Sequence, residues 1–220
     1  MPMGTEFLLP NKVIIKVCVK VTEWRFIRSN MLEGEQNYIK QAKRGDKEAF
    51  AELYRHYLPK IYRFVFLKVN NKTEAEDLTH EVFLNTWQNL NSYTPTEFPF
   101  SSWLYRIARN EVIDFYRTDK KNVRLDLVDE DFLKMPETES QDLDLVLSLE
   151  SVKNLIQFLR PEQQDVLIMR FIEDLSHKEI ANALNKSEGA IRLLQHRAIN
   201  ELKKIAEKNV GNTNQNITEA

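Results

Sequence analysis

Two carboxylates and an imidazole lie close together in the segment Ala75–Leu90, whose sequence is AEDLTHEVFLNTWQNL. Asp77 and Glu81 are four residues apart, which places them on one side of a helix with His80 beside them. Such groups could bind a metal ion, act as an enzyme's acid and base, or contact a partner protein. A metal site needs more ligands close in space, and the other three histidines fall in separate segments with no shared ligand spacing. We therefore predict no metal, and a partner-docking surface and a merely solvated helix face stay open as alternatives.

Arginines alternate with aromatic residues in a second segment, Phe100–Arg117 (FSSWLYRIARNEVIDFYR), which follows the turn-rich loop Asn91–Pro99. Unpaired bases stack on aromatic rings, and phosphate groups attract positive charge. The segment therefore suits single-stranded or unpaired DNA. An amphipathic helix with a solvated basic face fits the same residues equally well. The candidate DNA contacts are Trp103, Arg106, Arg109, Asn110 and Arg117.

Hydrogen-bond donors gather in a third segment, Ser176–Lys204. An arginine can bridge O6 and N7 of guanine, and a glutamine can pair with adenine, so a helix with these donors suits the DNA major groove. The alternative is an ordinary helical hairpin whose polar side is only solvated. The candidate residues are Ser187, Arg192, Gln195, His196 and Arg197.

The pattern around these donors predicts two short helices joined by a tight turn. Ser176 and Glu179 form a capping box at the start of the first helix. The pattern breaks at residues 185–187, where Ser187 can cap the second helix. The buried side of the second helix is expected to consist of Ala190, Ile191, Leu194 and Ala198. This arrangement is a helix-turn-helix.

The first half of the chain must position the other two segments. Glu35–Arg44 suits a short helix ended by Gly45, and Asp46 caps a longer helix in which Pro59 should produce a kink. Apolar residues recur there at helical spacing and predict a core-facing side, at Phe50, Leu53, Tyr57, Ile61, Phe64 and Val65. The next helix, to about Leu90, is expected to be capped by Thr73 together with Glu76.

Composition indicates a folded, mainly helical protein, because 42% of the 220 residues are apolar and only five are glycine. The net charge of −2 hides an uneven distribution, since eight acidic residues and one basic residue lie between Asp126 and Asp144. The rest of the chain carries 30 basic and 25 acidic residues. The sequence therefore has an acidic strip between two mildly basic units.

The single cysteine, Cys18, excludes an internal disulfide framework and a cysteine-rich zinc site, and it fits the reducing cytoplasm. No apolar run approaches the roughly 18 to 20 residues needed to span a bilayer, so no membrane insertion is expected. Residues 1–30 are interpreted as an appendage, with a signal peptide as the less favoured alternative because no small-residue cleavage site is present.

The second half of the chain begins with a linker. Residues 120–141 lack sustained periodicity and contain Pro136, whereas helical spacing resumes over Leu143–Leu159. Pro161 suits the first position of the next helix, where its missing N–H is harmless. Four helices, from Leu143 to about Lys208, should form one compact unit, and residues 209–220 should be a polar tail.

A basic-aromatic helix, an acidic linker and a terminal helix-turn-helix, in this order, resemble the bacterial sigma-70 family of RNA polymerase sigma factors, in its small two-domain extracytoplasmic-function (ECF) group. Ala75–Leu90 resembles the family's region 2.2, and Phe100–Arg117 resembles regions 2.3 and 2.4. The segment Leu159–Ala198 is similar to region 4. The resemblance covers about residues 45–117 and 146–204.

The resemblance implies roles for the three segments. Asp77, His80 and Glu81, with Trp87 further along, would dock on the clamp helices of the β′ subunit of core RNA polymerase, and His80 stands where relatives usually have Gln. The loop Asn91–Pro99 would capture an unpaired base of the minus-ten element. The arginine-rich helix behind it would face that element, with Trp103 followed by Leu104 in place of an aromatic pair, which implies weaker melting and stricter promoter choice.

In region 4 the resemblance assigns the second helix of the hairpin to the minus-thirty-five element, and the β flap of the polymerase becomes a further expected partner. Arg192, His196 and Arg197 match the family's DNA contacts, whereas Leu193 and Leu194 stand where many relatives have a small polar residue and an arginine. A changed base preference is therefore expected.

The expected architecture is all-α, with two small helical domains joined by a flexible acidic linker. Its parts are an appendage (1–30), region 2 (31–118), the linker (119–142), region 4 (143–208) and a tail (209–220). The expected function is promoter-specific initiation by a cytoplasmic sigma factor that is not an enzyme, needs no cofactor and is a possible target of an anti-sigma factor. A stand-alone helix-turn-helix regulator is the alternative.

Overall fold

The structure is a computed structural model that describes residues 32–69, 71–95, 98–119 and 152–215. All regular structure in these ranges is helical. The described residues divide into two compact units, one within Tyr38–Leu155 and the other mainly within Ile156–Ala220. The expected appendage (1–30), residues 120–142 of the linker and residues 143–151 of the expected region 4 lie outside the described residues.

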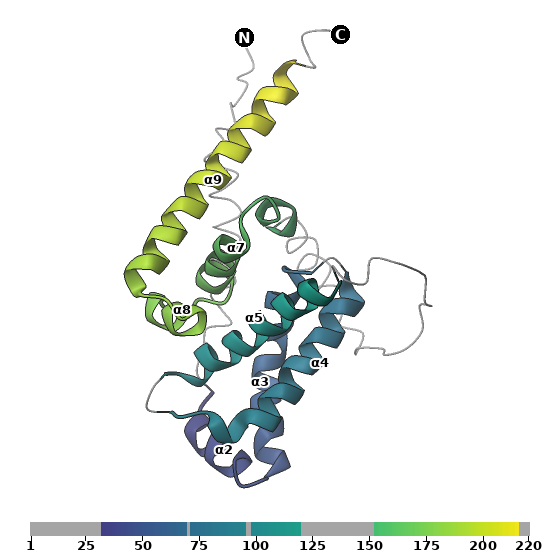
Figure 1. The fold of residues 1–220 in the computed structure, drawn as a ribbon, viewed down its shortest axis with the longest axis vertical. Coiled ribbons are helices and arrows are strands. Elements are labelled where there is room, and N and C mark those ends of the chain that lie inside the picture. The colour runs from purple at the N-terminus through teal and green to yellow at the C-terminus, as the bar shows by residue number, and fades with distance from the viewer. Residues whose placement is uncertain (1–31, 70, 96–97, 120–151, 216–220) are drawn as a thin grey trace, which may run out of the picture. The chain divides into compact units, whose positions relative to one another are not determined.

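Three long helices form the first unit (Figure 1). They are α3 (Lys47–Phe66), α4 (Lys72–Asn89) and α5 (Phe100–Asp119), and they pack against one another in all three pairs. The short helix α2 (Glu35–Ala42) precedes them, and a single helical turn, η2 (Leu90–Ser92), follows α4. The core holds fully buried aromatic and aliphatic side chains, among them Tyr57, Ile61, Phe64, Leu104 and Tyr105.

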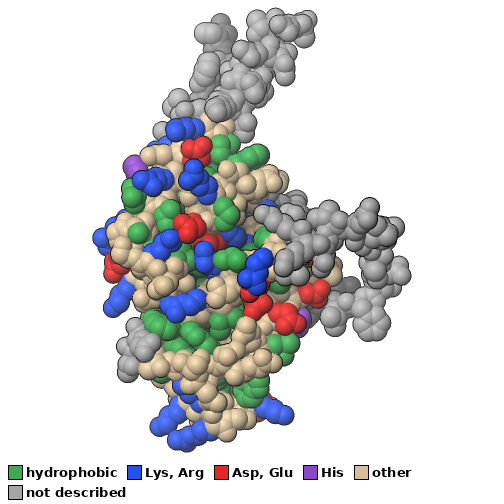
Figure 2. Space-filling view, viewed as in Figure 1, with side chains coloured by type: hydrophobic (Ala, Val, Ile, Leu, Met, Phe, Trp, Pro, Cys, Tyr) green, Lys and Arg blue, Asp and Glu red, His purple; other side chains and the backbone are tan. Residues whose placement is uncertain are grey.

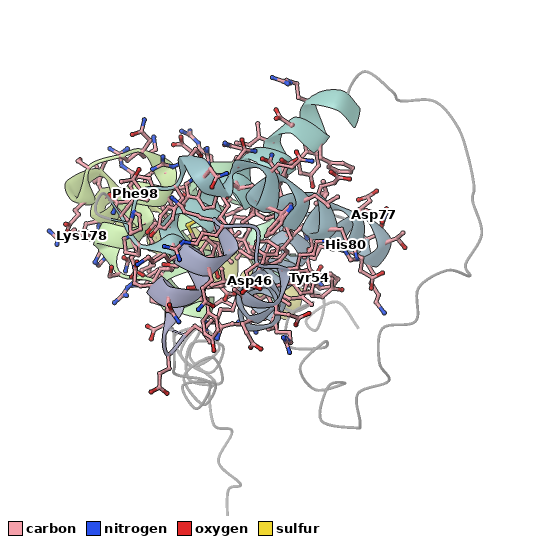
Figure 3. The ribbon with its side chains drawn as sticks, turned by 90° about the horizontal axis from the view of Figure 1, so that it is seen from below. Asp46, Tyr54, Asp77, His80, Phe98 and Lys178 are labelled. Carbon is pink, nitrogen blue, oxygen red and sulfur yellow. The ribbon has the colours of Figure 1, made fainter. Side chains whose placement is uncertain are left out.

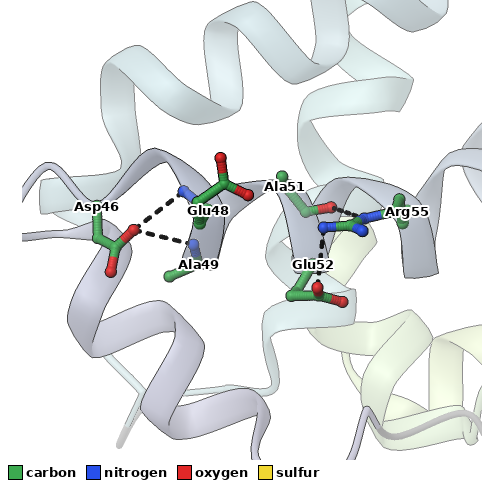
Figure 4. A network of polar contacts seen from close by, with 6 residues as sticks. All are labelled: Asp46, Glu48, Ala49, Ala51, Glu52 and Arg55. Atoms are coloured by element: carbon green, nitrogen blue, oxygen red, sulfur yellow. Dashed lines mark hydrogen bonds and ion pairs between the residues drawn. The ribbon is translucent and has the colours of Figure 1, made fainter.

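The predicted start of α3 is confirmed. Gly45 has a φ of +90°, which a residue with a side chain would adopt only with strain, and it ends the turn after α2. The carboxylate of Asp46 then accepts hydrogen bonds from the backbone N–H groups of Glu48 and Ala49 at 3.0 and 3.2 Å (Figure 4). On the exposed side of the same helix, Arg55 donates hydrogen bonds to the Ala51 carbonyl and to the Glu52 carboxylate.

Replacing Asp46 with Ala is expected to lower the free energy of unfolding by about 1 kcal/mol, because two N–H groups at the start of α3 lose their acceptor. Asp46→Asn keeps an acceptor oxygen and should cost much less. Urea unfolding followed by circular dichroism measures both changes. Equal losses in the two variants would show that the charge, rather than the capping hydrogen bonds, stabilises this helix end.

One expectation for the first unit needs correction. The helix α4 is capped by Asn71, whose side chain accepts from the Glu74 N–H at 2.7 Å, and not by Thr73 with Glu76. An Asn side chain serves this role as well as Thr does, so the cap lies two residues earlier than the capping-box pattern indicated. Pro59 lies inside α3, which continues to Phe66.

The second unit contains α7 (Pro161–Leu167), a π-helical turn η3 (Ile168–Ile172), α8 (His177–Leu184) and α9 (Glu188–Gln215). Pro161 occupies the first helical position, and the side chain of Gln163 accepts from the Arg160 N–H at 3.0 Å. The helices α7 and α8 both pack on α9. Because α9 continues to Gln215, the tail predicted to begin at residue 209 is helical over its first seven residues.

Candidate functional site

The acidic side of α4 is exposed. The opposite side of the helix is buried in the first unit through Ala75, Thr79, Val82, Phe83 and Thr86. The two threonine hydroxyls donate to the carbonyls four residues earlier, at 2.6 Å each, so they bring no unsatisfied polar group into the core. Asp77, His80 and Glu81 consequently point to solvent, and Figure 3 shows Asp77 and His80 along the same helix.

An apolar hollow of about 260 Å³ lies beside His80, between α3 and α4. Trp87, predicted to act with the acidic residues, forms part of its wall and meets the ring of Phe50 edge to face at 4.8 Å. The ring of Tyr54 meets Phe83 at 4.7 Å in the same way. Leu84 also lines the hollow and is 53% exposed. Carboxylates next to an exposed apolar hollow form a surface suited to a protein partner.

The structure offers no sign of a metal centre in this region. Among the described residues, no group of three or more His, Cys, Asp or Glu side chains is arranged to hold a metal ion.

The residue Trp103 requires a correction. It was expected to face DNA, but its side chain is only 8% exposed and packs against Tyr93 and Phe100 at centroid distances of 5.3 and 5.7 Å. Its position follows from the helix, because Trp103, Leu104 and Ala108 all lie on the buried side of α5. Trp103 is therefore a core residue that supports the loop before α5.

The polar candidates of α5 lie at or near its surface. The guanidinium group of Arg106 stacks over the ring of Phe98 at 4.8 Å, which joins the helix to the end of the preceding loop. Arg109 is half-buried and Asn110 is exposed. Arg117 is exposed and pairs with Asp114 at 3.2 Å, a contact of small energetic value at the surface.

Lys43, which was not among the residues predicted from the sequence, contacts the loop Asn91–Pro99. Lys43 donates from Nζ to the carbonyl oxygens of Tyr93 and Asn91 at 2.5 and 3.4 Å, and lies 5.9 Å from the Tyr93 ring. Tyr93 is 1% exposed, and its hydroxyl donates to the Phe98 carbonyl at 2.9 Å. Figure 2 shows basic side chains gathered at the lower end of the molecule, over α2 and the turn after it in Figure 1. No local pattern connects residues 50 positions apart, so only the fold could reveal this contact.

One tyrosine beside the α4 helix start has a strongly shifted pKa. Burial raises the pKa of Tyr62 to about 12, and the negative charge of Glu76 adds to the shift. Because the folded state keeps the phenol protonated, its contribution to stability is complete below pH 10 and is lost as the pH rises from 10 toward 12.

We expect Tyr62→Phe to reduce the loss of stability at alkaline pH. The free energy of unfolding of the unchanged chain should fall more steeply above pH 10 than that of the variant, and the ultraviolet titration of tyrosinate should lose one group near pH 12. Urea unfolding below and above pH 10 provides the measurement. Parallel pH profiles for the two chains would contradict the expectation.

The helix-turn-helix in the second unit has the predicted local structure. Ser176 and Glu179 exchange hydrogen bonds at the start of α8, and Asn185 ends this helix with a φ of +51°. The hydroxyl of Ser187 accepts from the Ala190 N–H at 3.2 Å and so caps α9. The predicted buried side is found at Ile191 and Ala198, which are fully buried.

The exposed side of α9 carries Arg192, His196 and Arg197. Arg192 pairs with Glu188 at 3.1 Å, and His196 shares a hydrogen bond with Asn200 at 2.9 Å. Gln195 is half-buried, and its side-chain oxygen lies 2.7 Å from Nε2 of His177 on α8. This contact would have to be exchanged before Gln195 could form the paired contact that adenine requires.

The described residues form only helices, with an exposed acidic side on α4, a basic helix behind an aromatic loop, and a helix-turn-helix. This combination is typical of DNA-binding proteins that act with a protein partner. The family model described as Sigma-70 region 2 matches residues 53–122, and the model described as Sigma-70, region 4 matches residues 147–204. The chain belongs to the sigma-70 family of RNA polymerase sigma factors. Regions 2 and 4 of this family mediate promoter recognition and binding to RNA polymerase, and sigma factors are initiation factors without enzymatic activity.

Curated relatives place the chain in the ECF group. It is 35% identical over 172 residues to the ECF RNA polymerase sigma factor BldN of Streptomyces coelicolor, a match that covers 76% of this chain and 64% of BldN. It is 34% identical over 175 residues to the ECF RNA polymerase sigma factor SigW of Bacillus subtilis, covering 76% of this chain and 93% of SigW.

Solved structures agree on the fold. CnrH, solved in complex with the cytosolic domain of CnrY, superposes with a TM-score of 0.63 at 22% identity over 80% of this chain and 98% of CnrH. The sigma factor RpoE, solved with the anti-sigma factor NepR from Bartonella quintana, gives a TM-score of 0.53 at 21% identity over 72% of this chain and 96% of RpoE. None of the helices formed by the described residues is both long and apolar enough to cross a membrane.

Proposed function

We propose that this chain binds core RNA polymerase through the exposed side of α4 and recognises promoters at two separate points. Asp77, His80 and Glu81 would contact the β′ clamp helices, and the apolar hollow at Trp87 would receive an apolar side chain next to them. The observation that carries this assignment is the coincidence of three exposed polar groups with an exposed apolar hollow on one helix pair.

The minus-ten element would be bound by the loop Asn91–Pro99 and the polar side of α5. Arg106, Arg109, Asn110 and Arg117 supply the charge and donors, whereas the buried Trp103 supports the loop from behind. Opening of the duplex would be driven by binding energy, with extruded bases held in protein pockets.

The minus-thirty-five element would be bound by the first turns of α9. Ser187 at the helix start together with Arg192, His196 and Arg197 would enter the major groove, with the β flap of the polymerase as the protein partner of this region. The proposed division is region 2 at residues 31–118, a linker at 119–142 and region 4 at 143–208. The proposed location is the cytoplasm, where core polymerase is found.

Reconstitution with core RNA polymerase tests the proposal. The holoenzyme should select a two-part promoter from a library of genomic fragments and start transcription at a fixed distance from it. A chain that binds duplex DNA specifically without core polymerase would instead be a stand-alone helix-turn-helix regulator. A chain that neither binds core polymerase nor supports any transcription would overturn the proposal.

Regulation by an anti-sigma factor is a further part of the proposal, since relatives of this fold were solved in complex with such proteins. Crosslinking in the source cells should capture the expected partner. This protein should compete with core polymerase for the chain and block the reconstituted transcription.

A further inference from the structure

One large apolar side chain projects from the recognition helix. Leu193 is 48% exposed, and it is the only large apolar residue among the described side chains of α9 that is exposed. Its neighbour Leu194 is half-buried, on the side of the helix that also carries the fully buried Ile191 and Ala198. The two leucines are therefore not equivalent, and only Leu193 lies on the outer side.

The surroundings of Leu193 on that outer side are polar. His196 and Arg197 are three and four residues further along the helix, so they are its direct neighbours on the surface, and Arg192 precedes it. An exposed leucine in the middle of a set of DNA-binding side chains does not stabilise the fold, because its surface stays in water. It gains free energy only when something apolar covers it.

Three polar side chains near Leu193 already have partners, two of them within α9 and one on α8. Arg192 is held by Glu188 at 3.1 Å, and His196 shares its hydrogen bond with Asn200 at 2.9 Å. Gln195 is held by His177 at 2.7 Å. Each of these contacts must be exchanged before the side chain can bind a base, whereas Leu193 needs no such exchange.

The DNA major groove presents one apolar group, the C5-methyl of thymine. An aliphatic side chain on a recognition helix can cover this methyl and thereby distinguish thymine from cytosine and from uracil. The alternative is that Leu193 contacts a protein. A protein on this side of α9 would also cover Arg192, His196 and Arg197 and keep them from DNA.

We propose that Leu193 is a specificity-determining residue that recognises the methyl group of a thymine in the minus-thirty-five element. The inference rests on the proposed function, in which the first turns of α9 enter the major groove. It assigns to this chain an apolar contact at a position where hydrogen-bond donors were expected.

The experiment uses the full chain with core RNA polymerase and a promoter duplex selected from a random library by that holoenzyme. Each thymine of the upstream element is replaced in turn by deoxyuridine, which lacks only the methyl group, and the dissociation constant is measured for each duplex. At one position the replacement should weaken binding roughly fourfold, the effect of burying one methyl-sized group.

The same duplexes are then measured with Leu193→Ala. This variant should bind the thymine duplex more weakly and should bind the thymine and deoxyuridine duplexes equally well. Phe158→Ala is the matched control, because Phe158 is also an exposed apolar residue of the second unit, at 64% exposure, and has no assigned role. It should retain the fourfold preference for thymine.

Three outcomes would overturn the inference. The first is that no deoxyuridine replacement in the upstream element affects binding. The second is that one deoxyuridine replacement weakens binding by the same factor in Leu193→Ala as in the unchanged chain. The methyl effect would then belong to another residue or to DNA shape. The third is that Leu193→Ala weakens core polymerase binding without any change in DNA preference. A holoenzyme that selects no promoter at all would instead contradict the proposed function.

Discussion

Reversing the charge of Glu81 with lysine is expected to weaken binding of the chain to core RNA polymerase by about 30-fold or more. Glu81 is exposed on α4 in the fold, so the change removes no core contact. If it forms a buried charge pair with the clamp helices, losing one partner costs about 2 to 5 kcal/mol, and reversal adds repulsion. The loss should appear in direct binding and, to the same degree, in transcription at limiting sigma concentration.

A matched reversal separates this effect from a general change in charge. Glu201→Lys alters an exposed carboxylate of α9, in the other compact unit, by the same two charges. It should bind core polymerase as the unchanged chain does. If both charge-reversal variants bind core polymerase equally well, the α4 surface is not the docking site. If circular dichroism shows that Glu81→Lys unfolds the chain, Leu84→Ala replaces it as the test. Intact binding of Leu84→Ala would then exclude the α4 surface.

Replacing Arg192 with Ala is expected to weaken promoter binding by the holoenzyme by roughly 1 to 3 kcal/mol, or about fivefold to 150-fold, if its guanidinium group bridges a guanine. The side chain is 63% exposed, and its pairing with Glu188 is a surface contact that DNA can replace. The loss should be confined to duplexes that carry the preferred base at one upstream position.

The conservative variant Arg192→Lys distinguishes base recognition from phosphate binding. A lysine keeps the positive charge but cannot form the two parallel hydrogen bonds to guanine, so it should not restore the base preference. Lys204→Ala, a further exposed cation of α9, is the control and should change affinity little. An equal loss for all sequences in Arg192→Ala, restored by lysine, would assign Arg192 to the phosphate backbone.

Local patterns predicted the elements well where the determinants lie within a few residues. The capping box of Ser176 and Glu179, the cap at Asp46 and the left-handed glycine at position 45 are all contained in four to five consecutive residues. The cap of α4 was misplaced because Asn71 and Thr73 are both good capping residues, and the local pattern does not decide between them.

Side-chain roles were predicted less well because they depend on contacts between elements. Trp103 has the residue type of a base-stacking group, yet the packing of α5 turns it toward Tyr93 and Phe100. Gln195 has the type of an adenine-binding residue, yet His177 on another helix holds its oxygen. Spacing places a residue on one side of a helix, but it does not tell which partner the fold brings to that side.

The contact made by Lys43 comes from outside the part of the chain that matches the Sigma-70 region 2 model. The match to the family starts at Leu53, but the loop Asn91–Pro99 is fastened by a lysine ten residues before that point. A fragment that starts at Leu53 would keep α4 and α5 and lose the side chain that contacts the loop between them. The segment matched by similarity is thus shorter than the set of residues whose contacts hold this loop in place.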